Sequence, residues 1–131
     1  MSKAPLLALS LLAIQFLSPA SAGELTSTGD DTFKKDVLTS KQTVIVDFYA
    51  TWCGPCKMLA PRMEALSQRQ DLSKIKFYRL DVDASPKTAS KYGVKFLPTV
   101  IVFKQGKVVD KAEGNPSPDD LTLLVKHATD K

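Results

Sequence analysis

In two short runs of the chain, apolar side chains occupy both the odd-numbered and the even-numbered positions. Residues 42–50 read QTVIVDFYA and are rich in β-branched residues, and residues 74–83 read KIKFYRLDVD. A short run of this kind is typical of a strand that is covered on both faces of its sheet. Residues 99–114 contain two further strands around a turn at residues 105–106. A short first strand is expected near residues 25–27.

The spacing of apolar residues becomes helical after the first of these runs. From Cys53 to about Gln70 the apolar side chains recur every three or four positions along one helix face, at Cys56, Leu59, Met63 and Leu66. Pro55 suits the first helical turn, where a missing N–H is tolerated. Pro61 falls in the interior of the segment, where a proline is expected to kink the helix.

Three shorter stretches also have helical signals. Residues 31–40 space their apolar side chains helically, with Asp30 as a candidate cap. Residues 85–93 predict a short helix that Gly93 ends. Residues 117–120, Ser-Pro-Asp-Asp, supply the cap, the first residue and the acidic first turn of a last helix. Its apolar positions are Leu121, Leu124, Val125 and Ala128.

The first 22 residues have a different pattern and do not resemble part of a fold. Lys3 precedes an apolar core at residues 6–17, and SPASA follows it, with small residues at the positions that a signal peptidase reads. Residues 1–22 are therefore predicted to be a signal peptide that is cut after Ala22. An uncleaved membrane anchor is the alternative, but the apolar core is shorter than the roughly 20 residues that a spanning helix needs. We expect an exported protein, periplasmic or secreted into a lumen or medium.

Residues 23–131 have the length of one domain. The alternation of strands and helices predicts an α/β layered domain with a mixed sheet. The chain has a net charge of +4, but its lysines and arginines are scattered and form no block or stripe. We read them as a solvated surface, so nucleic acid is not an expected partner.

The two cysteines of the chain, Cys53 and Cys56, stand three positions apart and could serve as metal ligands, as a staple or as a reagent. A zinc site usually needs four ligands, and the one histidine, His127, lies far away in the sequence. A metal would therefore need a site shared between two chains, and none is expected. A staple around so short a loop contributes only about 2 kcal/mol by the loop-closure formula.

The reagent reading has positive support from the position of the pair. Cys53 is expected where a strand ends and a helix begins, and there the free backbone N–H groups and the helix dipole favour a thiolate. Cys56 lies one turn into the helix on its core face, where it should be buried and less ionised. This asymmetry predicts that Cys53 attacks a substrate disulfide and that Cys56 then resolves the mixed disulfide.

Several stretches of residues 23–131 together resemble the thioredoxin family. They are VDFYATWCGPCK around the cysteines, KYGVKFLPT, and the FKQGK turn, in the family's order and spacing. The resemblance implies the thioredoxin fold, which is a central mixed β-sheet flanked by α-helices. It also implies reduction of protein disulfides without a bound cofactor, by a Cys53/Cys56 dithiol–disulfide cycle.

The resemblance assigns a third catalytic residue, Asp47. It is the one acid in an apolar strand, and burial should raise the pKa of its carboxyl group. By resemblance it is the proton acceptor, through water, that helps Cys56 to ionise. The alternative is a buried polar group that is satisfied by hydrogen bonds.

Six residues are expected to bind substrate. For some of them a purely structural role is the alternative. By resemblance the Leu97-Pro98 bond is cis and packs against the cysteine pair, leaving the Leu97 backbone free to pair with an extended substrate; otherwise Pro98 simply starts a strand. Trp52 should shield the site, unless it is a core residue. Gly114, like Gly93, either lets backbone approach this face or is an ordinary turn glycine. Gly54 and Pro55 complete the face between the two cysteines.

Two residues depart from the family pattern. Tyr49 stands where many members have tryptophan, and Phe96 replaces a residue that is small in some members and adds apolar bulk near the binding groove. The bulk of Phe96 leaves the substrate preference open, while the chemistry that the resemblance implies is unchanged. Rival readings are an oxidase or isomerase of the same fold, and a non-catalytic binding module. A monomer is expected, with protein disulfides as substrates and an upstream electron donor, either a membrane electron importer or a thioredoxin reductase.

Overall fold

The computed structural model describes residues 24–131. The predicted signal peptide, residues 1–22, lies outside this range. Five strands form one sheet in the order β1-β3-β2-β4-β5. The strands are β1 (Leu25–Thr28), β2 (Val44–Tyr49), β3 (Lys76–Asp81), β4 (Thr99–Lys104) and β5 (Lys107–Glu113).

The sheet is mixed, as predicted. β3 pairs in parallel with β1 and β2, whereas β4 pairs antiparallel with both β2 and β5. β2 is therefore a central strand, and every residue of Val44–Phe48 is buried. The expectation that this run is covered on both faces is confirmed.

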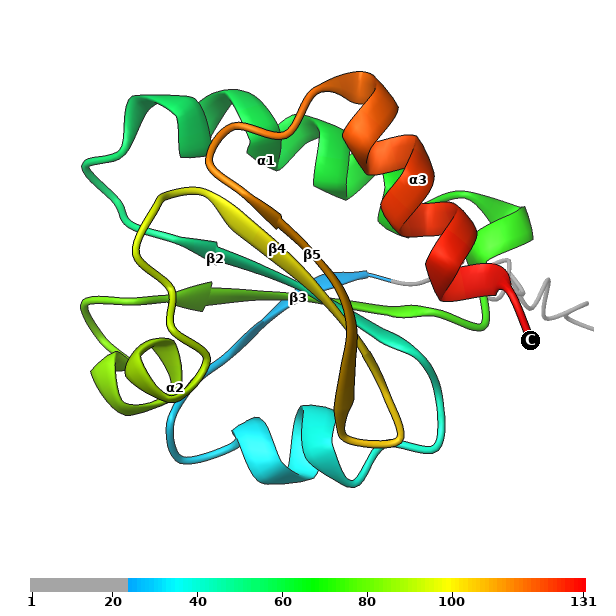
Figure 1. Ribbon diagram of the computed structural model, residues 1–131, viewed down its shortest axis with the longest axis horizontal. Coiled ribbons are helices and arrows are strands. Elements are labelled where there is room, and N and C mark those ends of the chain that lie inside the picture. Colours follow the sequence, from blue (N-terminus) through cyan, green and yellow to red (C-terminus); the bar gives the residue numbers. More distant parts are fainter. Residues whose placement is uncertain (1–23) are drawn as a thin grey trace, which may run out of the picture.

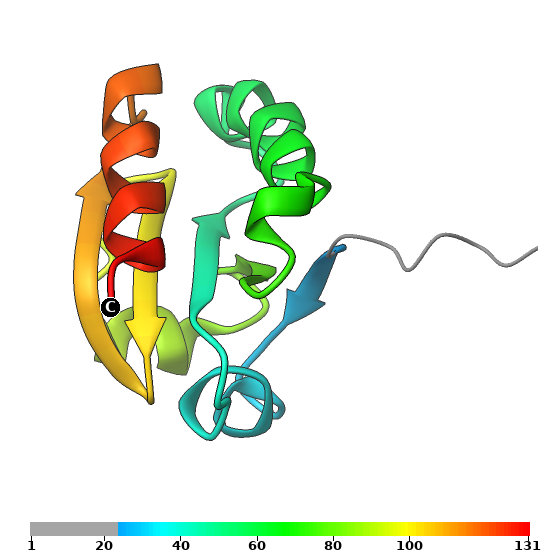
Figure 2. The ribbon, with the colours of Figure 1, turned by 90° about the vertical axis from the view of Figure 1, so that its right-hand side faces the viewer.

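Helices cover both faces of the sheet. They are α1 (Gly54–Ser67), α2 (Pro86–Lys91) and α3 (Pro118–Thr129), with a π-helical segment at Lys34–Leu38 and a 3₁₀ turn at Gln70–Leu72. Figures 1 and 2 show α1 and α3 together on one side of the sheet, with α2 and the π-helical segment on the other. The result is a three-layer domain.

The alternation of side chains along β2 divides the core into two clusters. Ile45 packs with Leu59 of α1 and Leu121 of α3 on one face. Val44 and Val46 pack on the other face with residues of the π-helical segment. Because successive side chains of a strand point to opposite faces, the odd-numbered positions of β2 face α1 and α3.

The first predicted helix differs from the structure in both extent and cap. Residues 31–40 contain only the five-residue π-helical segment, in which Val37 is buried. Asp30 does not cap it. The carboxylate of Asp30 instead accepts hydrogen bonds from the backbone N–H groups of Lys87 and Thr88, in the first turn of α2. This contact joins residues more than 50 positions apart, so local sequence gives no sign of it.

Helix α1 begins and packs as its sequence predicts. Cys53 is its N-cap, Pro55 lies in its first turn, and Cys56, Leu59 and Met63 are buried. The helix continues through Pro61 and ends at Ser67, slightly earlier than the pattern suggested. Its buried face therefore runs from the cysteine pair into the core.

The turns near the end of the chain also follow the sequence. The β4–β5 turn has positive φ at both central residues, 50° at Gln105 and 76° at Gly106, which suits a tight hairpin. Helix α3 starts with a capping box, in which Ser117 and Asp120 exchange hydrogen bonds between side chain and backbone.

Candidate active site

Cys53 and Cys56 form a disulfide at the junction between β2 and α1, with their Cα atoms 5.3 Å apart. Their side chains are almost fully buried, with 5% and 1% of the surface exposed. The backbone N–H of Cys56 donates a hydrogen bond to Cys53 Sγ at 3.2 Å. In the reduced protein the same N–H and the helix dipole would favour negative charge on Cys53, rather than on the deeper Cys56.

The loop before β4 packs against this disulfide. The Leu97-Pro98 peptide bond is cis, as predicted. Leu97 is partly buried and contacts the small cluster formed by Ala50, Cys53 and Cys56. The loop therefore lies beside the cysteine pair.

Gly114 lies at the same end of the sheet as this loop. Residue Glu113, just before it, pairs with Thr99, which follows Pro98. Gly114 has a φ of +75°, and a Cβ built on it would meet nothing within 4 Å. Its glycine identity is therefore explained by the backbone conformation, while its position places it next to the Leu97-Pro98 loop.

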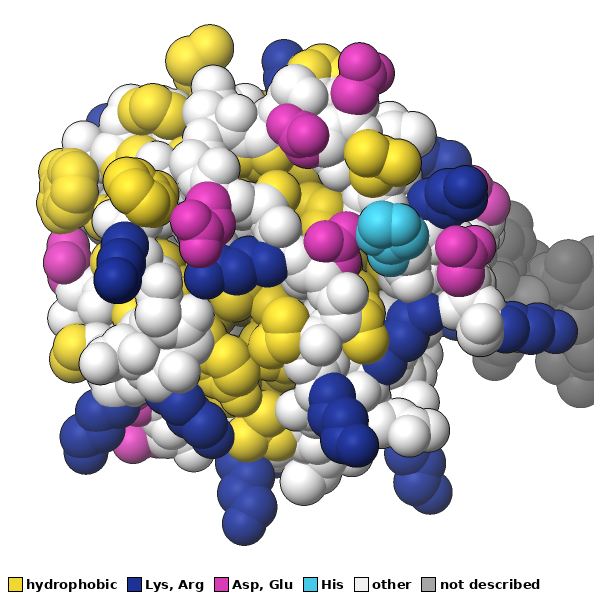
Figure 3. Space-filling view, viewed as in Figure 1, with side chains coloured by type: hydrophobic (Ala, Val, Ile, Leu, Met, Phe, Trp, Pro, Cys, Tyr) yellow, Lys and Arg dark blue, Asp and Glu magenta, His cyan; other side chains and the backbone are white. Residues whose placement is uncertain are grey.

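The surface around the cysteines is apolar and exposed. Trp52 is 70% exposed, so the alternative of a core tryptophan is wrong, and its Nε1 donates a hydrogen bond to Asp83 Oδ2 at 2.8 Å. Met58 and Phe96 are also largely exposed. Hydrophobic side chains gather at the upper left of Figure 3, over the loop that leads into α1. Gly54 and Pro55 are exposed as well.

Asp47 is fully buried in the middle of β2. Neither of its carboxyl oxygens has a hydrogen-bond partner among the protein groups of residues 24–131. Burial raises the pKa of Asp47 from 3.8 to about 6, and the opposing charge of Arg79 limits the rise. The predicted direction of the shift is confirmed. Because Asp47 is an odd-numbered position of β2, it faces the layer that contains α1 and Cys56.

Two residues near Asp47 were not recognised from the sequence as parts of the site. Arg79 of β3 pairs with Asp47 in the sheet register, and its Nε lies 3.7 Å from Asp47 Oδ2. Its guanidinium carbon lies 3.8 Å from the centroid of the Tyr49 ring. The available signal was a single arginine inside the apolar run KIKFYRLDVD, but its partner depends on strand register, which the sequence does not state.

Comparison with known proteins supports one family. The thioredoxin family model matches residues 24–127. A thioredoxin from Synechocystis sp. is 47% identical over 85 residues, which cover 65% of this chain and 78% of that protein. The chain belongs to the thioredoxin family. A second relative, a thioredoxin from Streptomyces clavuligerus, is 45% identical over 93 residues, covering 71% of this chain and 85% of the relative.

A solved structure agrees with this assignment. The crystal structure of a thioredoxin from Malassezia sympodialis matches with a TM-score of 0.75 and 32% sequence identity, over 85% of this chain and 96% of the other. The thioredoxin fold expected from the sequence is thus confirmed. Family membership together with the closely spaced disulfide makes this protein a thiol–disulfide oxidoreductase, and specifically a reductase of protein disulfides.

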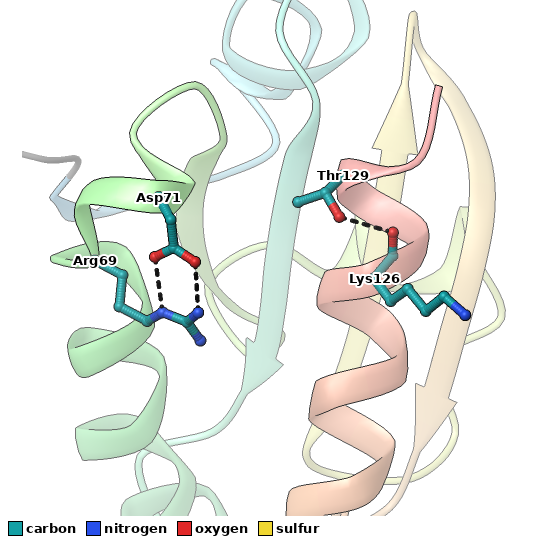
Figure 4. Close-up of polar contacts among 4 residues, drawn as sticks. All are labelled: Arg69, Asp71, Lys126 and Thr129. Atoms are coloured by element: carbon teal, nitrogen blue, oxygen red, sulfur yellow. Dashed lines mark hydrogen bonds and ion pairs between the residues drawn. The ribbon is translucent and has the colours of Figure 1, made fainter.

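A groove on the described part of the protein is separate from the disulfide. It has a volume of about 660 Å³ and lies between α1 and α3, with Leu66, Leu121 and Val125 among its lining residues. Figure 4 shows that polar groups at one end of it already have partners. Arg69 forms a bidentate ion pair with Asp71, in which Nε donates to Oδ1 at 3.0 Å and Nη2 donates to Oδ2 at 2.6 Å.

Across the same groove, on α3, the Thr129 hydroxyl donates to the Lys126 carbonyl at 3.0 Å, and the Lys126 side chain extends away from α1 (Figure 4). The Arg69 guanidinium and the Thr129 hydroxyl, which line this groove, therefore have partners within the protein.

The residues that can bind metals are dispersed. Within residues 24–131 no group of three or more histidine, cysteine, aspartate or glutamate side chains is arranged to hold a metal ion. His127 is half exposed, and its Nδ1 lies 2.6 Å from Asp110 Oδ2, which ties α3 to β5. In the same range no helix is long and apolar enough to cross a membrane.

Proposed function

We propose that this protein is an exported thioredoxin that reduces protein disulfides, with Cys53 as the attacking residue and Cys56 as the resolving residue. The observation that carries this assignment is the asymmetry of the pair. Cys53 caps the start of α1 and its sulfur accepts a hydrogen bond, whereas Cys56 is the more deeply buried of the two. A thiolate is therefore stabilised at Cys53 in preference to Cys56.

The cycle has two exchange steps. The Cys53 thiolate attacks one sulfur of a substrate disulfide, and the other substrate sulfur leaves as a thiolate, so a mixed disulfide forms on Cys53. Cys56 then loses its proton and attacks Cys53 Sγ, which forms the Cys53–Cys56 disulfide and releases the second substrate sulfur. Two electrons pass from the protein to the substrate, and no cofactor is needed.

Asp47 is proposed to accept the Cys56 proton, by way of water. Its carboxyl group has a pKa of about 6, lies on the sheet face that α1 covers, and has no hydrogen-bond donor among residues 24–131. A base with a pKa just below neutral is ionised at pH 7 and still takes up a proton readily. These three properties support the role.

The apolar surface around the disulfide is proposed to bind substrate. Leu97 packs against the cysteine cluster, and its backbone would pair with an extended substrate segment, as in strand addition. Trp52, Gly54, Pro55, Pro98 and Gly114 would contact the same segment, because they lie at the same end of the sheet or in the exposed turn between the cysteines.

Export and the source of electrons form the remaining part of the proposal. The signal-peptide pattern of residues 1–22 supports export to a compartment in which disulfides normally persist. A reductase there needs an electron donor, such as a membrane electron importer in a bacterium or a lumenal reductase in a eukaryote. Suitable clients are exported proteins whose cysteines must stay reduced. The protein is proposed to act as a monomer.

Reduction of insulin disulfides with dithiothreitol as electron source tests the activity. We expect the wild type to accelerate insulin precipitation and the Cys53→Ser/Cys56→Ser double variant to leave it at the uncatalysed rate. A wild-type protein that instead oxidises a reduced peptide faster than it reduces insulin would be an oxidase. Equal rates for wild type and double variant would indicate a binding module.

A further inference from the structure

Asp47, Tyr49 and Arg79 lie on one face of the sheet. Asp47 and Tyr49 are two positions apart in β2, so their side chains point to the same side. Arg79 is the register partner of Asp47 in the neighbouring parallel strand β3. Tyr49 in turn packs against the cluster that contains the two cysteines. The arginine thus extends between the buried acid and a ring that borders the disulfide.

The ion pair between Arg79 and Asp47 is unusually incomplete for a buried carboxyl group. The 3.7 Å between Arg79 Nε and Asp47 Oδ2 is within ion-pair range but too long for a hydrogen bond. Within the described residues, neither Nε nor either carboxyl oxygen has any hydrogen-bond partner. Arginine and carboxylate normally close into two parallel hydrogen bonds when geometry allows.

The Tyr49 ring accounts for the open pair. At 3.8 Å from the ring centroid, the guanidinium is in stacking contact with the ring. The ring itself is partly buried against the cysteine cluster. The guanidinium is therefore held by a fixed surface on one side, instead of being free to swing fully onto the carboxyl group.

We propose that Tyr49 is a positioning residue, which holds the Arg79 guanidinium close to the Asp47 carboxyl group without letting it hydrogen-bond there. The positive charge then partly offsets the burial of the acid, while the oxygens stay free to exchange a proton with Cys56. This inference rests on the proposed proton-accepting role of Asp47, but it concerns the position of Arg79 and can be tested without turnover.

Among the described residues, Arg79 is the charged group that acts on Asp47. On β4, the register partner of Asp47 is the uncharged Val100. On β3, Asp81 uses its carboxylate to accept hydrogen bonds from the backbone N–H groups of Asp83 and Ala84.

Helix α1 contributes Cys56 to this side of the sheet, and it does not titrate while it is in the disulfide. The neighbouring Lys57 is exposed to solvent. A change in the titration of Asp47 after substitution of Tyr49 therefore reports on Arg79.

Carboxyl ¹³C NMR of the oxidised protein measures the titration of Asp47 directly. Wild type should titrate near 6. In Tyr49→Leu the guanidinium is released, closes onto the carboxylate with two hydrogen bonds, and moves the midpoint down toward the ordinary value of 3.8. Tyr49→Phe keeps the ring and should leave the midpoint where it is. Tyr49→Ile, a residue suited to a strand, replaces the leucine variant if that variant does not fold.

Repeating the titration in an Arg79→Leu protein tests whether Tyr49→Leu shifts the Asp47 midpoint by way of Arg79. Arg79→Leu alone should move the midpoint above the wild-type value, and Tyr49→Leu should then add no downward shift. An unchanged midpoint in Tyr49→Leu, or the same downward shift with and without Arg79, overturns the proposal. The proton-acceptor role of Asp47 is tested separately, by the turnover of Asp47→Asn. Normal turnover of that variant would exclude the role without changing the expected titration midpoints.

Discussion

The backbone N–H of Cys56 points at the sulfur of Cys53, 3.2 Å away. In the proposed mechanism this hydrogen bond distinguishes the two cysteines, although they are joined in one disulfide. When the disulfide is reduced, the donor remains at the start of α1 and can stabilise a thiolate on Cys53. We propose that Cys56 instead relies on a base, Asp47, to lose its proton.

Asp47→Asn should slow turnover near neutral pH, because Cys56 then lacks its proton acceptor. The rate of the second exchange step, measured by stopped-flow fluorescence with a mixed disulfide on Cys53, is the suitable readout. Asp31→Asn, at an exposed acid, is the matched control and should leave that rate unchanged. A wild-type rate for Asp47→Asn would remove Asp47 from the mechanism.

The same substitution should stabilise the fold at pH 7. The folded-state pKa of Asp47 is about 6, above the ordinary 3.8, so the wild type loses stability as pH rises between these values and stays at the lower level above them. The full penalty is about 3 kcal/mol. Urea unfolding at pH 4 and pH 7 should show Asp47→Asn gaining over wild type mainly at pH 7. An equal difference at both pH values would show that the carboxyl group titrates normally.

Phe96→Ser should raise KM for protein substrates with little change in kcat, because it removes an exposed apolar contact and leaves the cysteines intact. Loss of roughly half of a phenylalanine contact corresponds to about 1 kcal/mol, or about fivefold in KM. Leu123→Ser, at an exposed apolar residue of α3, is the control and should behave as wild type. A fall in kcat at constant KM would argue against a docking role for Phe96.

Gly106→Ala should destabilise the fold more than Gly93→Ala. Both glycines have positive φ, for which alanine costs about 1 kcal/mol. Only at Gly106 would the new Cβ also meet a backbone atom, the Leu38 carbonyl oxygen at 2.6 Å. Thermal unfolding of the two variants measures the difference. Equal losses would mean that the backbone around Leu38 yields without cost.

The electron supply can be tested in the source cell. Acid quenching followed by thiol alkylation reports the redox state of Cys53 and Cys56. We expect a largely reduced pair that becomes oxidised when the dedicated donor is deleted. A pair that is fully oxidised at steady state, with a reduction potential as high as that of an oxidase, would reverse the direction of electron flow.

Much of the fold follows from local patterns in the sequence. The apolar run of β2, the helical spacing from Cys56 to Met63 and the Ser117–Asp120 capping box are each encoded within a few neighbouring residues. These features depend on backbone propensity and on burial of one face, which short-range spacing reports well. The cysteine motif likewise lies within a few neighbouring residues, so the sequence alone was enough to locate the site.

Long-range contacts were not accessible in this way. Asp30 caps α2 across 57 residues, and Arg79 reaches Asp47 only because β2 and β3 pair in one register. Tyr49 was noticed as a departure from the family, but its contact with Arg79 depends on that same pairing. The sequence therefore predicted that Asp47 is buried, but only the structure showed that Arg79 and Tyr49 lie beside it.

Trapping of mixed disulfides tests the central assignment most directly. Reduced Cys56→Ser and Cys53→Ser variants are incubated with insulin, quenched with an alkylating agent and analysed by non-reducing electrophoresis and mass spectrometry. We predict that Cys56→Ser accumulates an insulin adduct on Cys53, because the resolving thiol is missing, and that Cys53→Ser accumulates essentially none. Comparable trapping through Cys56 in the Cys53→Ser variant would contradict the roles assigned to the two cysteines.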